Sequence, residues 1–154
     1  MSRRYEIPGA PLLVLDFLLL DVNGTLTDRG ELIDGVAERL QLLAADLPIT
    51  LLSSDTRGTL DGLGQFLGLE AVRVARGEEK RAIVAERGAQ RCAAIGNGAN
   101  DAPMLAAAAL GIAVVGPEGA GSAAVRAADV VCASILAALD LLLDPRVLAS
   151  TLRP

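Results

Sequence analysis

Short apolar runs alternate with longer amphipathic stretches along most of this chain. Between residues 16 and 131, each apolar run is followed by a turn signal and then by a helical pattern of apolar positions. This alternation is typical of repeated β-α units, in which parallel strands are joined by right-handed crossovers. The pattern therefore predicts an α/β protein: a three-layer, Rossmann-like fold with a central, mainly parallel sheet.

The predicted elements follow one another at close spacing. Strands are expected at 16–22, 49–52, 71–74, 92–95, 111–115 and 128–131, and helices at about 35–45, 57–67, 78–87, 102–108, 120–127 and 134–143. Pro145 is expected to stop the last helix and Asp34 to cap the first. The apolar face of that first helix is predicted to comprise Val36, Leu40, Leu42 and Leu43.

Two hairpins are predicted beside this alternation. Residues 3–7 and 11–15 flank a turn rich in proline and glycine, which predicts a short N-terminal β-hairpin. A smaller hairpin is expected at 24–33, around the turn Asp28-Arg29-Gly30. A length of 154 residues suits one compact domain, so 1–154 is predicted to be a single domain.

Composition excludes several classes of function. Hydrophobic residues make up 52% of the chain and aromatic residues only 2%, so the core is expected to be aliphatic. A net charge of -5, without a cluster of basic residues, argues against a nucleic-acid partner. The chain has no histidine, which excludes histidine-based catalysis and the usual transition-metal sites.

The chain is expected to be soluble and cytoplasmic. Cys92 and Cys132 are too few for a disulfide framework, which favours a reducing compartment. Met1 to Arg4 lead into no apolar segment of the kind found in signal peptides. The longest apolar stretches, such as 104–115, are shorter than the roughly 18 residues that suggest a membrane span. We therefore expect no membrane partner.

Polar residues gather where predicted strands end, at 21–25, 53–55 and 97–101. Open α/β sheets bind ligands at the carboxyl edge, so these segments are expected to face one pocket. Lys80, at the start of a predicted helix, is the only lysine of the chain. Asn23, Asn97 and Asn100 are its only asparagines, and every copy of these two residue types therefore lies at a candidate site.

Each candidate also has a simpler structural explanation. Asp21 precedes a glycine turn, and Asp55 and Asp101 precede predicted helices that they would cap. Lys80 on a charged helix would ordinarily be solvated. Gly96-Asn97-Gly98 does not complete a dinucleotide fingerprint, and Gly116 to Gly121 lacks the ending of a P-loop. The functional interpretation depends on co-occurrence of the candidates.

The combination suits phosphoryl transfer. An aspartate such as Asp21 can attack phosphorus when other groups neutralise the phosphoryl charge. Ser53, Lys80 and the N–H groups of a glycine turn are groups of this kind. Mg²⁺ prefers oxygen ligands, which Asp21 and Asp101 would supply with the carbonyl of Asn23 and the side-chain oxygen of Asn97.

The chain resembles the haloacid dehalogenase superfamily, and within it the phosphorylation domain of P-type ATPases. The matching pieces are DVNGTLT at 21–27, Ser53, Lys80, GNGANDAPML at 96–105 and AALGIAV at 108–114. Their order and spacing are similar to those of the small, soluble P-type-ATPase-like proteins. The stretch 54–79 is too short for a cap domain, so the resemblance implies access controlled by the hairpin at 24–33 or by a partner subunit.

The resemblance implies a role for each matching position. Asp21 would be the nucleophile and a Mg²⁺ ligand, with the carbonyl of Asn23, Asn97 and Asp101 completing the metal site. Ser53 and Lys80 would hold the phosphoryl group. Further phosphate contacts are expected from Asn23, Gly24, Ser54 and Asn100.

Two positions depart from the phosphatase pattern. Asn23 replaces the acid/base aspartate, and an amide cannot protonate a leaving oxygen. Asn97 replaces the first metal-site aspartate, which should weaken Mg²⁺ binding. One hypothesis is a slow Mg²⁺-dependent phosphohydrolase for small phosphorylated substrates with good leaving groups. The alternative is a non-catalytic phosphate-sensing or scaffold module. The apolar N-terminal segment favours self-association as a homo-oligomer.

Overall fold

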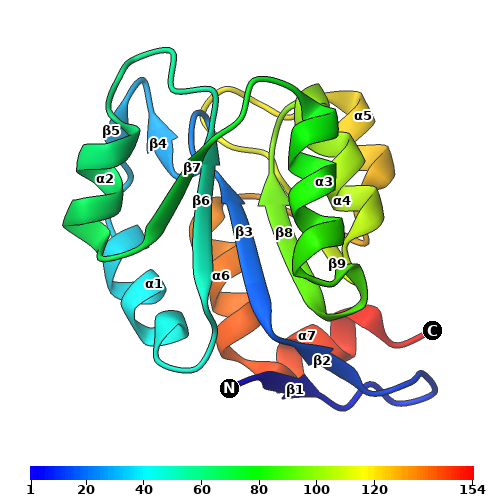
Figure 1. The fold of residues 1–154 in the computed structure, drawn as a ribbon. Coiled ribbons are helices and arrows are strands. Elements are labelled where there is room, and N and C mark those ends of the chain that lie inside the picture. Colours follow the sequence, from blue (N-terminus) through cyan, green and yellow to red (C-terminus); the bar gives the residue numbers. More distant parts are fainter.

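A computed structural model describes residues 1–154 and has a six-stranded parallel sheet at its centre (Figure 1). The strand order is β10-β9-β8-β3-β6-β7, so β3 lies in the middle of the sheet. The main strands are β3 (Phe17–Asp21), β6 (Ile49–Ser53), β7 (Glu70–Arg73), β8 (Cys92–Gly96), β9 (Leu110–Val114) and β10 (Val130–Cys132). This arrangement confirms the predicted α/β class.

Seven α-helices connect and cover these strands. They are α1 (Val36–Ala44), α2 (Leu60–Leu67), α3 (Gly77–Arg87), α4 (Ala102–Ala107), α5 (Ser122–Ala127), α6 (Ile135–Leu143) and α7 (Pro145–Leu152). Two 3₁₀ turns, Ala89–Arg91 and Ala99–Asp101, precede β8 and α4. None of the helices has the length and hydrophobicity needed to cross a membrane.

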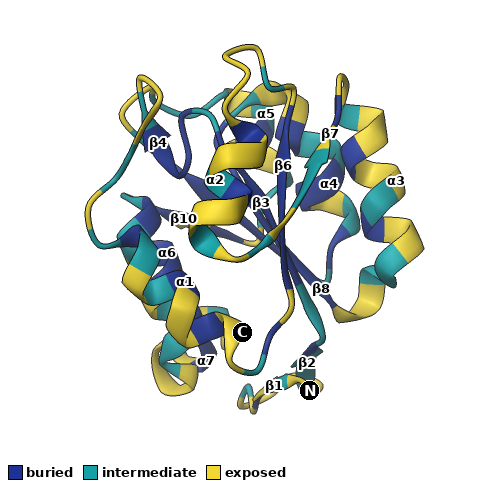
Figure 2. Cartoon of the chain, turned by 60° about the vertical axis from the view of Figure 1, so that its left-hand side comes forward, coloured by how far each residue is buried: buried dark blue, intermediate teal, exposed yellow.

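The two faces of the sheet pack against different helices. Along β3, Leu18 and Leu20 belong to one core cluster, with residues of α1 and α6, whereas Leu19 belongs to a second cluster, with residues of α3 and α4. This alternation follows from the two-residue period of a strand. Figure 2 shows buried strands between helices whose outer surfaces are exposed. The result is the predicted three-layer arrangement.

Both predicted hairpins are present, at opposite edges of the molecule (Figure 1). β1 (Arg3–Tyr5) pairs antiparallel with β2 (Leu13–Leu15). β4 (Thr27–Asp28) pairs antiparallel with β5 (Glu31–Leu32), close to the carboxyl ends of the parallel strands. The β4–β5 hairpin therefore lies at the edge where the candidate residues are expected.

Two local predictions were wrong, and one helix was missed. Asp34 does not cap α1: the N-cap is Gly35, with φ 89°, a conformation that glycine adopts without steric cost. Leu42 is 62% exposed, so it does not belong to the buried face of α1. α6 ends at Leu143, before Pro145, as predicted, but Pro145 also begins α7, a helix that the sequence pattern did not predict. The missing N–H of Pro145 is tolerated at this position, and Asp144 accepts a hydrogen bond from the N–H of Arg146.

Candidate functional site

The ends of three neighbouring strands bring the candidate residues together. Asp21 ends β3, Ser53 ends β6, and Asn97 directly follows β8. Because β3 pairs in parallel with both β6 and β8, these three ends lie side by side. Lys80 reaches them from the first turn of α3. The strand order β8-β3-β6 therefore creates the site.

Lys80 joins two carboxylates inside the protein. Its ammonium donates hydrogen bonds to Oδ1 of Asp21 at 2.9 Å and to Oδ1 of Asp101 at 2.6 Å. The side chain of Lys80 is only 2% exposed. Burial alone would lower the pKa of Lys80, but the charges and hydrogen bonds of the two carboxylates outweigh it and raise the pKa. Lys80 is therefore a permanent buried cation rather than a solvated one.

Asp101 anchors the turn that follows β8. Its Oδ2 accepts hydrogen bonds from the N–H groups of Asn97 at 3.0 Å and Gly98 at 2.9 Å, while Oδ1 accepts from Lys80. It occupies the N-cap position of α4 but makes no side-chain bond to that helix. A Cβ on Gly96 would collide with the Asp101 carboxyl group, so glycine is required there. Asp101 thus links the position of Asn97 to that of Lys80.

Thr25 is a member of this network that the sequence reasoning missed. Its hydroxyl lies 2.9 Å from Oδ2 of Asp21 and 3.2 Å from Oδ1 of Asn97, within donating distance of both. The side chain is fully buried. The available signal was a hydroxyl four residues after Asp21 in the same glycine-containing loop. A hydroxyl has one proton, so it can satisfy only one of these two oxygens at a time.

The site holds excess negative charge. Two carboxylates, Asp21 and Asp101, face the single ammonium of Lys80. Burial, followed by the charge of Asp101, raises the pKa of Asp21 to about 6, even though Lys80 and Thr25 lower it. At pH 7 an ionised Asp21 is therefore held against a desolvation cost. A bound cation would offset this cost.

The residues fit a magnesium ion. Oδ2 of Asp21 and Oδ1 of Asn97 converge on one hydroxyl, which leaves an acceptor without a proton. The structure contains no group of three Asp, Glu, Cys or His side chains that could hold a metal ion on their own. Mg²⁺ commonly uses one or two carboxylates and keeps several waters, which matches this donor set.

Ser53 is oriented by its neighbours. Its hydroxyl oxygen accepts hydrogen bonds from the side-chain amide of Asn23 at 3.3 Å and from the N–H of Asp55 at 2.9 Å. Two accepted bonds use both lone pairs, so the hydroxyl proton is left to donate elsewhere. The Asp55 carboxylate accepts hydrogen bonds from the N–H groups of Thr59 and Leu60, so it binds the first N–H of α2, although the N-cap residue is Thr59.

The other sequence-predicted residues lie around this network. Gly24 has φ 75° and lies in the loop between Asp21 and Thr25. Ser54 and Asn100 are exposed, and neither forms a side-chain hydrogen bond with the buried residues. The structure therefore brings Asp21, Ser53 and Lys80 close together but leaves Ser54 and Asn100 at the surface.

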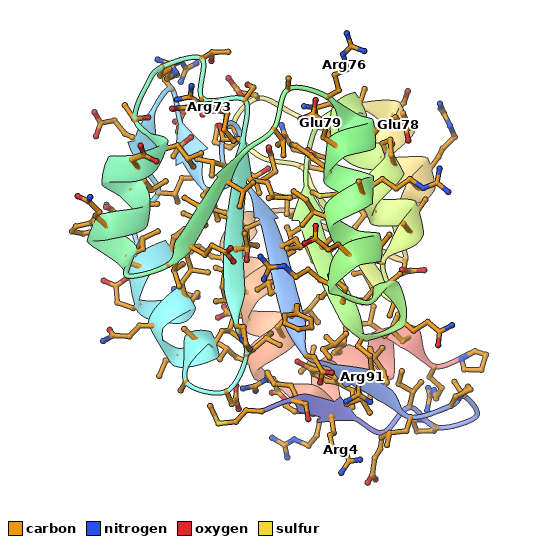
Figure 3. All side chains as sticks on the ribbon, in the orientation of Figure 1. Arg4, Arg73, Arg76, Glu78, Glu79 and Arg91 are labelled. Carbon is orange, nitrogen blue, oxygen red and sulfur yellow. The ribbon has the colours of Figure 1, made fainter.

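A cleft of about 340 Å³ opens beside Asn23. It lies between the β4–β5 hairpin and the start of α2, and its lining side chains are all uncharged. A larger hollow of about 500 Å³ lies near Arg4, between the N-terminal hairpin and α7. Figure 3 shows Arg4 at the edge of the molecule opposite Arg73 and Arg76, so this hollow is remote from the strand ends.

Comparisons with known proteins give the family and the fold of the chain. The family model described as haloacid dehalogenase-like hydrolase matches residues 6–109. The "Probable cation-transporting ATPase G" of Mycobacterium tuberculosis is 39% identical over 94 residues, which cover 59% of this chain and 12% of that protein. An uncharacterized protein of Methanocaldococcus jannaschii is 50% identical over 60 residues, covering 39% of this chain and 64% of that one. The chain thus spans less than two thirds of either relative.

Two solved structures share the fold. The cobalt-bound deoxy-D-mannose-octulosonate 8-phosphate phosphatase of Haemophilus influenzae has a TM-score of 0.71 and 22% identity, with 86% of this chain and 89% of that one covered. The 3-deoxy-D-manno-octulosonate 8-phosphate phosphatase of Moraxella catarrhalis, in complex with magnesium, phosphate and KDO, has a TM-score of 0.68 and 17% identity, with 85% and 87% covered. Both of those proteins hold a divalent metal in their structures.

Proposed function

The chain belongs to the haloacid dehalogenase-like hydrolase family, and from this membership we propose that it is a Mg²⁺-dependent phosphohydrolase acting through an aspartyl-phosphate on Asp21. The observation that carries the proposal is the buried network in which Lys80 joins Asp21 and Asp101. A buried ion pair is not in itself a source of stability, so its place at the sheet edge is better explained by function.

Each residue has a defined task in this proposal. An oxygen of Asp21 attacks phosphorus and forms the aspartyl-phosphate. The bond between phosphorus and the leaving oxygen breaks, and the leaving oxygen keeps the electron pair. Lys80 and the free proton of Ser53 bind the non-bridging phosphoryl oxygens. Water then attacks the aspartyl-phosphate, which releases phosphate and regenerates Asp21. When bound, Mg²⁺ neutralises charge on Asp21 and on the phosphoryl group.

The proposed substrates are small and have good leaving groups. The amide of Asn23 cannot donate a proton as a carboxylic acid does, so the leaving oxygen must depart unprotonated. Acyl phosphates, aryl phosphates and anhydrides meet this condition. The cleft beside Asn23 has uncharged lining side chains, which favours a leaving group with no charge apart from that of its departing oxygen. We propose that residues 1–154 act as one domain, with the β4–β5 hairpin at the entrance.

The proposal is tested by release of phosphate from acetyl phosphate and para-nitrophenyl phosphate, with and without Mg²⁺. We expect Mg²⁺-dependent hydrolysis by the wild type and none by an Asp21→Ala variant. Equal rates of phosphate release for the two proteins would reject the proposal that the protein is a phosphohydrolase. They would favour a non-catalytic phosphate-sensing or scaffold module instead.

A carboxyl group at position 23 is expected to widen the range of leaving groups. Asn23→Asp should raise kcat for an alkyl phosphate by about 100-fold, the low end of the contribution of a positioned general acid. Turnover of para-nitrophenyl phosphate should rise much less, because its leaving group needs no proton. Gln65→Glu, an exposed position on α2, adds the same charge and should change neither rate. Equal gains on both substrates would contradict the role assigned to Asn23.

A further inference from the structure

The turn between β9 and α5 has no role in the function proposed above. It contains Gly116 to Gly121, the segment that lacks the ending of a P-loop. The N–H of Gly119 donates to the carbonyl of Gly116 at 2.9 Å, and Gly119 has φ 74°. Glu118 therefore lies at the tip of a closed turn, and its backbone position is fixed.

This turn is fastened to the candidate active site at three points. The side-chain amide of Asn97 donates to the carbonyl of Gly119 at 3.2 Å, and the N–H of Gly121 donates to the carbonyl of Asn97 at 2.7 Å. A Cβ on Gly116 would lie 2.5 Å from the carbonyl oxygen of Gly24, so the two loops touch. The tip of the turn thus rests against Asn97 and the loop that follows Asp21.

The carboxylate of Glu118 lies over Gly24. A Cβ on Gly24 would collide with Oε2 of Glu118 and would lie 2.9 Å from the side-chain nitrogen of Asn97. Glu118 forms no ion pair or side-chain hydrogen bond, in contrast to the fully paired carboxylate of Asp101. The turn therefore adds an unpaired negative charge to a site that already has an excess of negative charge.

We propose that Glu118 supplies to the divalent cation the negative charge that Asn97 lacks. Its carboxylate accepts hydrogen bonds from water molecules bound to the cation, on the side of the site where Asn97 and Gly24 meet. Mg²⁺ keeps several of its waters in proteins, which leaves a place for an acceptor outside the direct ligands. This inference rests on the proposed Mg²⁺-dependent function and names a further residue for the same site.

The proposal predicts weaker metal binding by Glu118→Gln. Groups that bond to metal-bound ligands typically contribute 10- to 100-fold to affinity, so the Kd for Mg²⁺ should rise by about 10-fold. Isothermal titration calorimetry would measure the Kd for Mg²⁺. Electron paramagnetic resonance of free Mn²⁺ would measure the Kd for Mn²⁺ as a second divalent cation. Glu118 is exposed, so the substitution leaves folding intact.

Glu78→Gln is a matched control. Glu78 is an exposed glutamate in the first turn of α3, at the same edge of the sheet (Figure 3). The substitution removes the same charge, but the Glu78 carboxylate faces Arg81 rather than Gly24 and Asn97. The Kd of this variant for Mg²⁺ should therefore stay within about twofold of the wild type, because a charge that acts only through solvent is screened. Equal losses of affinity in both variants would overturn the proposal, because they would show only a general charge effect.

A double substitution separates this inference from the proposed function. Asn97→Asp should tighten Mg²⁺ binding. When Glu118→Gln is added to Asn97→Asp, the Kd for Mg²⁺ should rise by clearly less than 10-fold. A wild type that binds Mg²⁺ and releases phosphate from acetyl phosphate, with the same Kd for Mg²⁺ in Glu118→Gln, would overturn the role of Glu118 alone. A wild type that neither binds Mg²⁺ nor releases phosphate would reject the proposed function and this inference together.

Discussion

Lys80→Met is expected to lower the free energy of unfolding by about 3–5 kcal/mol at pH 8, the usual cost of removing one partner of a buried ion pair. Lys80 is 2% exposed, and its ammonium lies within 3 Å of oxygens of both Asp21 and Asp101. Methionine has a similar length and fills the same space without the charge. The variant would therefore leave two buried carboxylates without a counter-charge.

Urea denaturation at pH 8 and pH 5 measures this effect. The difference in the free energy of unfolding between Lys80→Met and the wild type should be smaller at pH 5 than at pH 8, because an unpaired Asp21 can take up a proton at pH 5. Arg81→Met is the matched control on the same helix, since Arg81 is 62% exposed and its ion pair with Glu78 is 3.9 Å long. Its cost should stay below about 1 kcal/mol. A similar loss in both variants would show that Lys80 matters only for helix α3.

Asp21→Asn is expected to have opposite effects on activity and stability. Removing the nucleophile should lower phosphate release by roughly 10⁴-fold or more. The metal-free protein, however, should become more stable at pH 8. The new amide can accept from Lys80 and donate to Thr25, whose proton then goes to Asn97, so each group in the network keeps a partner.

The pH dependence of this stabilisation follows from the pKa of Asp21. Burial, and then Asp101, raises that pKa from 3.8 to about 6 in the folded protein. The folded protein therefore binds this proton more tightly than the unfolded chain does. The resulting contribution of Asp21 to the free energy of unfolding is fully present below about pH 3.8 and is lost as the pH rises through 6. Above pH 6 the variant should be more stable than the wild type by roughly 1–3 kcal/mol, and below pH 4 the two should agree.

Thermal denaturation from pH 4 to pH 8 would test this prediction. Mg²⁺ should raise the Tm of the wild type and have little effect on Asp21→Asn, because the cation offsets the same charge that the substitution removes. An Asp21→Asn protein that is less stable than the wild type at pH 8 would show that the carboxylate contributes more through its hydrogen bonds than it costs through burial.

The sequence alone was sufficient for the fold class. The two-residue and helical periods of apolar positions report on which side of each element is buried, and this is a local property of the chain. The positions of Asp21, Ser53 and Lys80 after apolar runs or at a helix start also predicted a shared edge. Local patterns failed at Asp34 and missed the helix α7 that begins at Pro145, because glycine and proline allow backbone conformations that several cap arrangements can use.

What only the tertiary structure decided is how these residues contact one another. The order β8-β3-β6, which depends on packing between distant segments, puts Asn97 and Ser53 on either side of Asp21. The burial of Lys80 between two carboxylates, and the use of Thr25 by both Asp21 and Asn97, follow from that order. The turn that carries Glu118 to Gly24 depends on it as well. Periodicity records which residues are buried, but the partners of a buried charge are set by contacts across the whole fold.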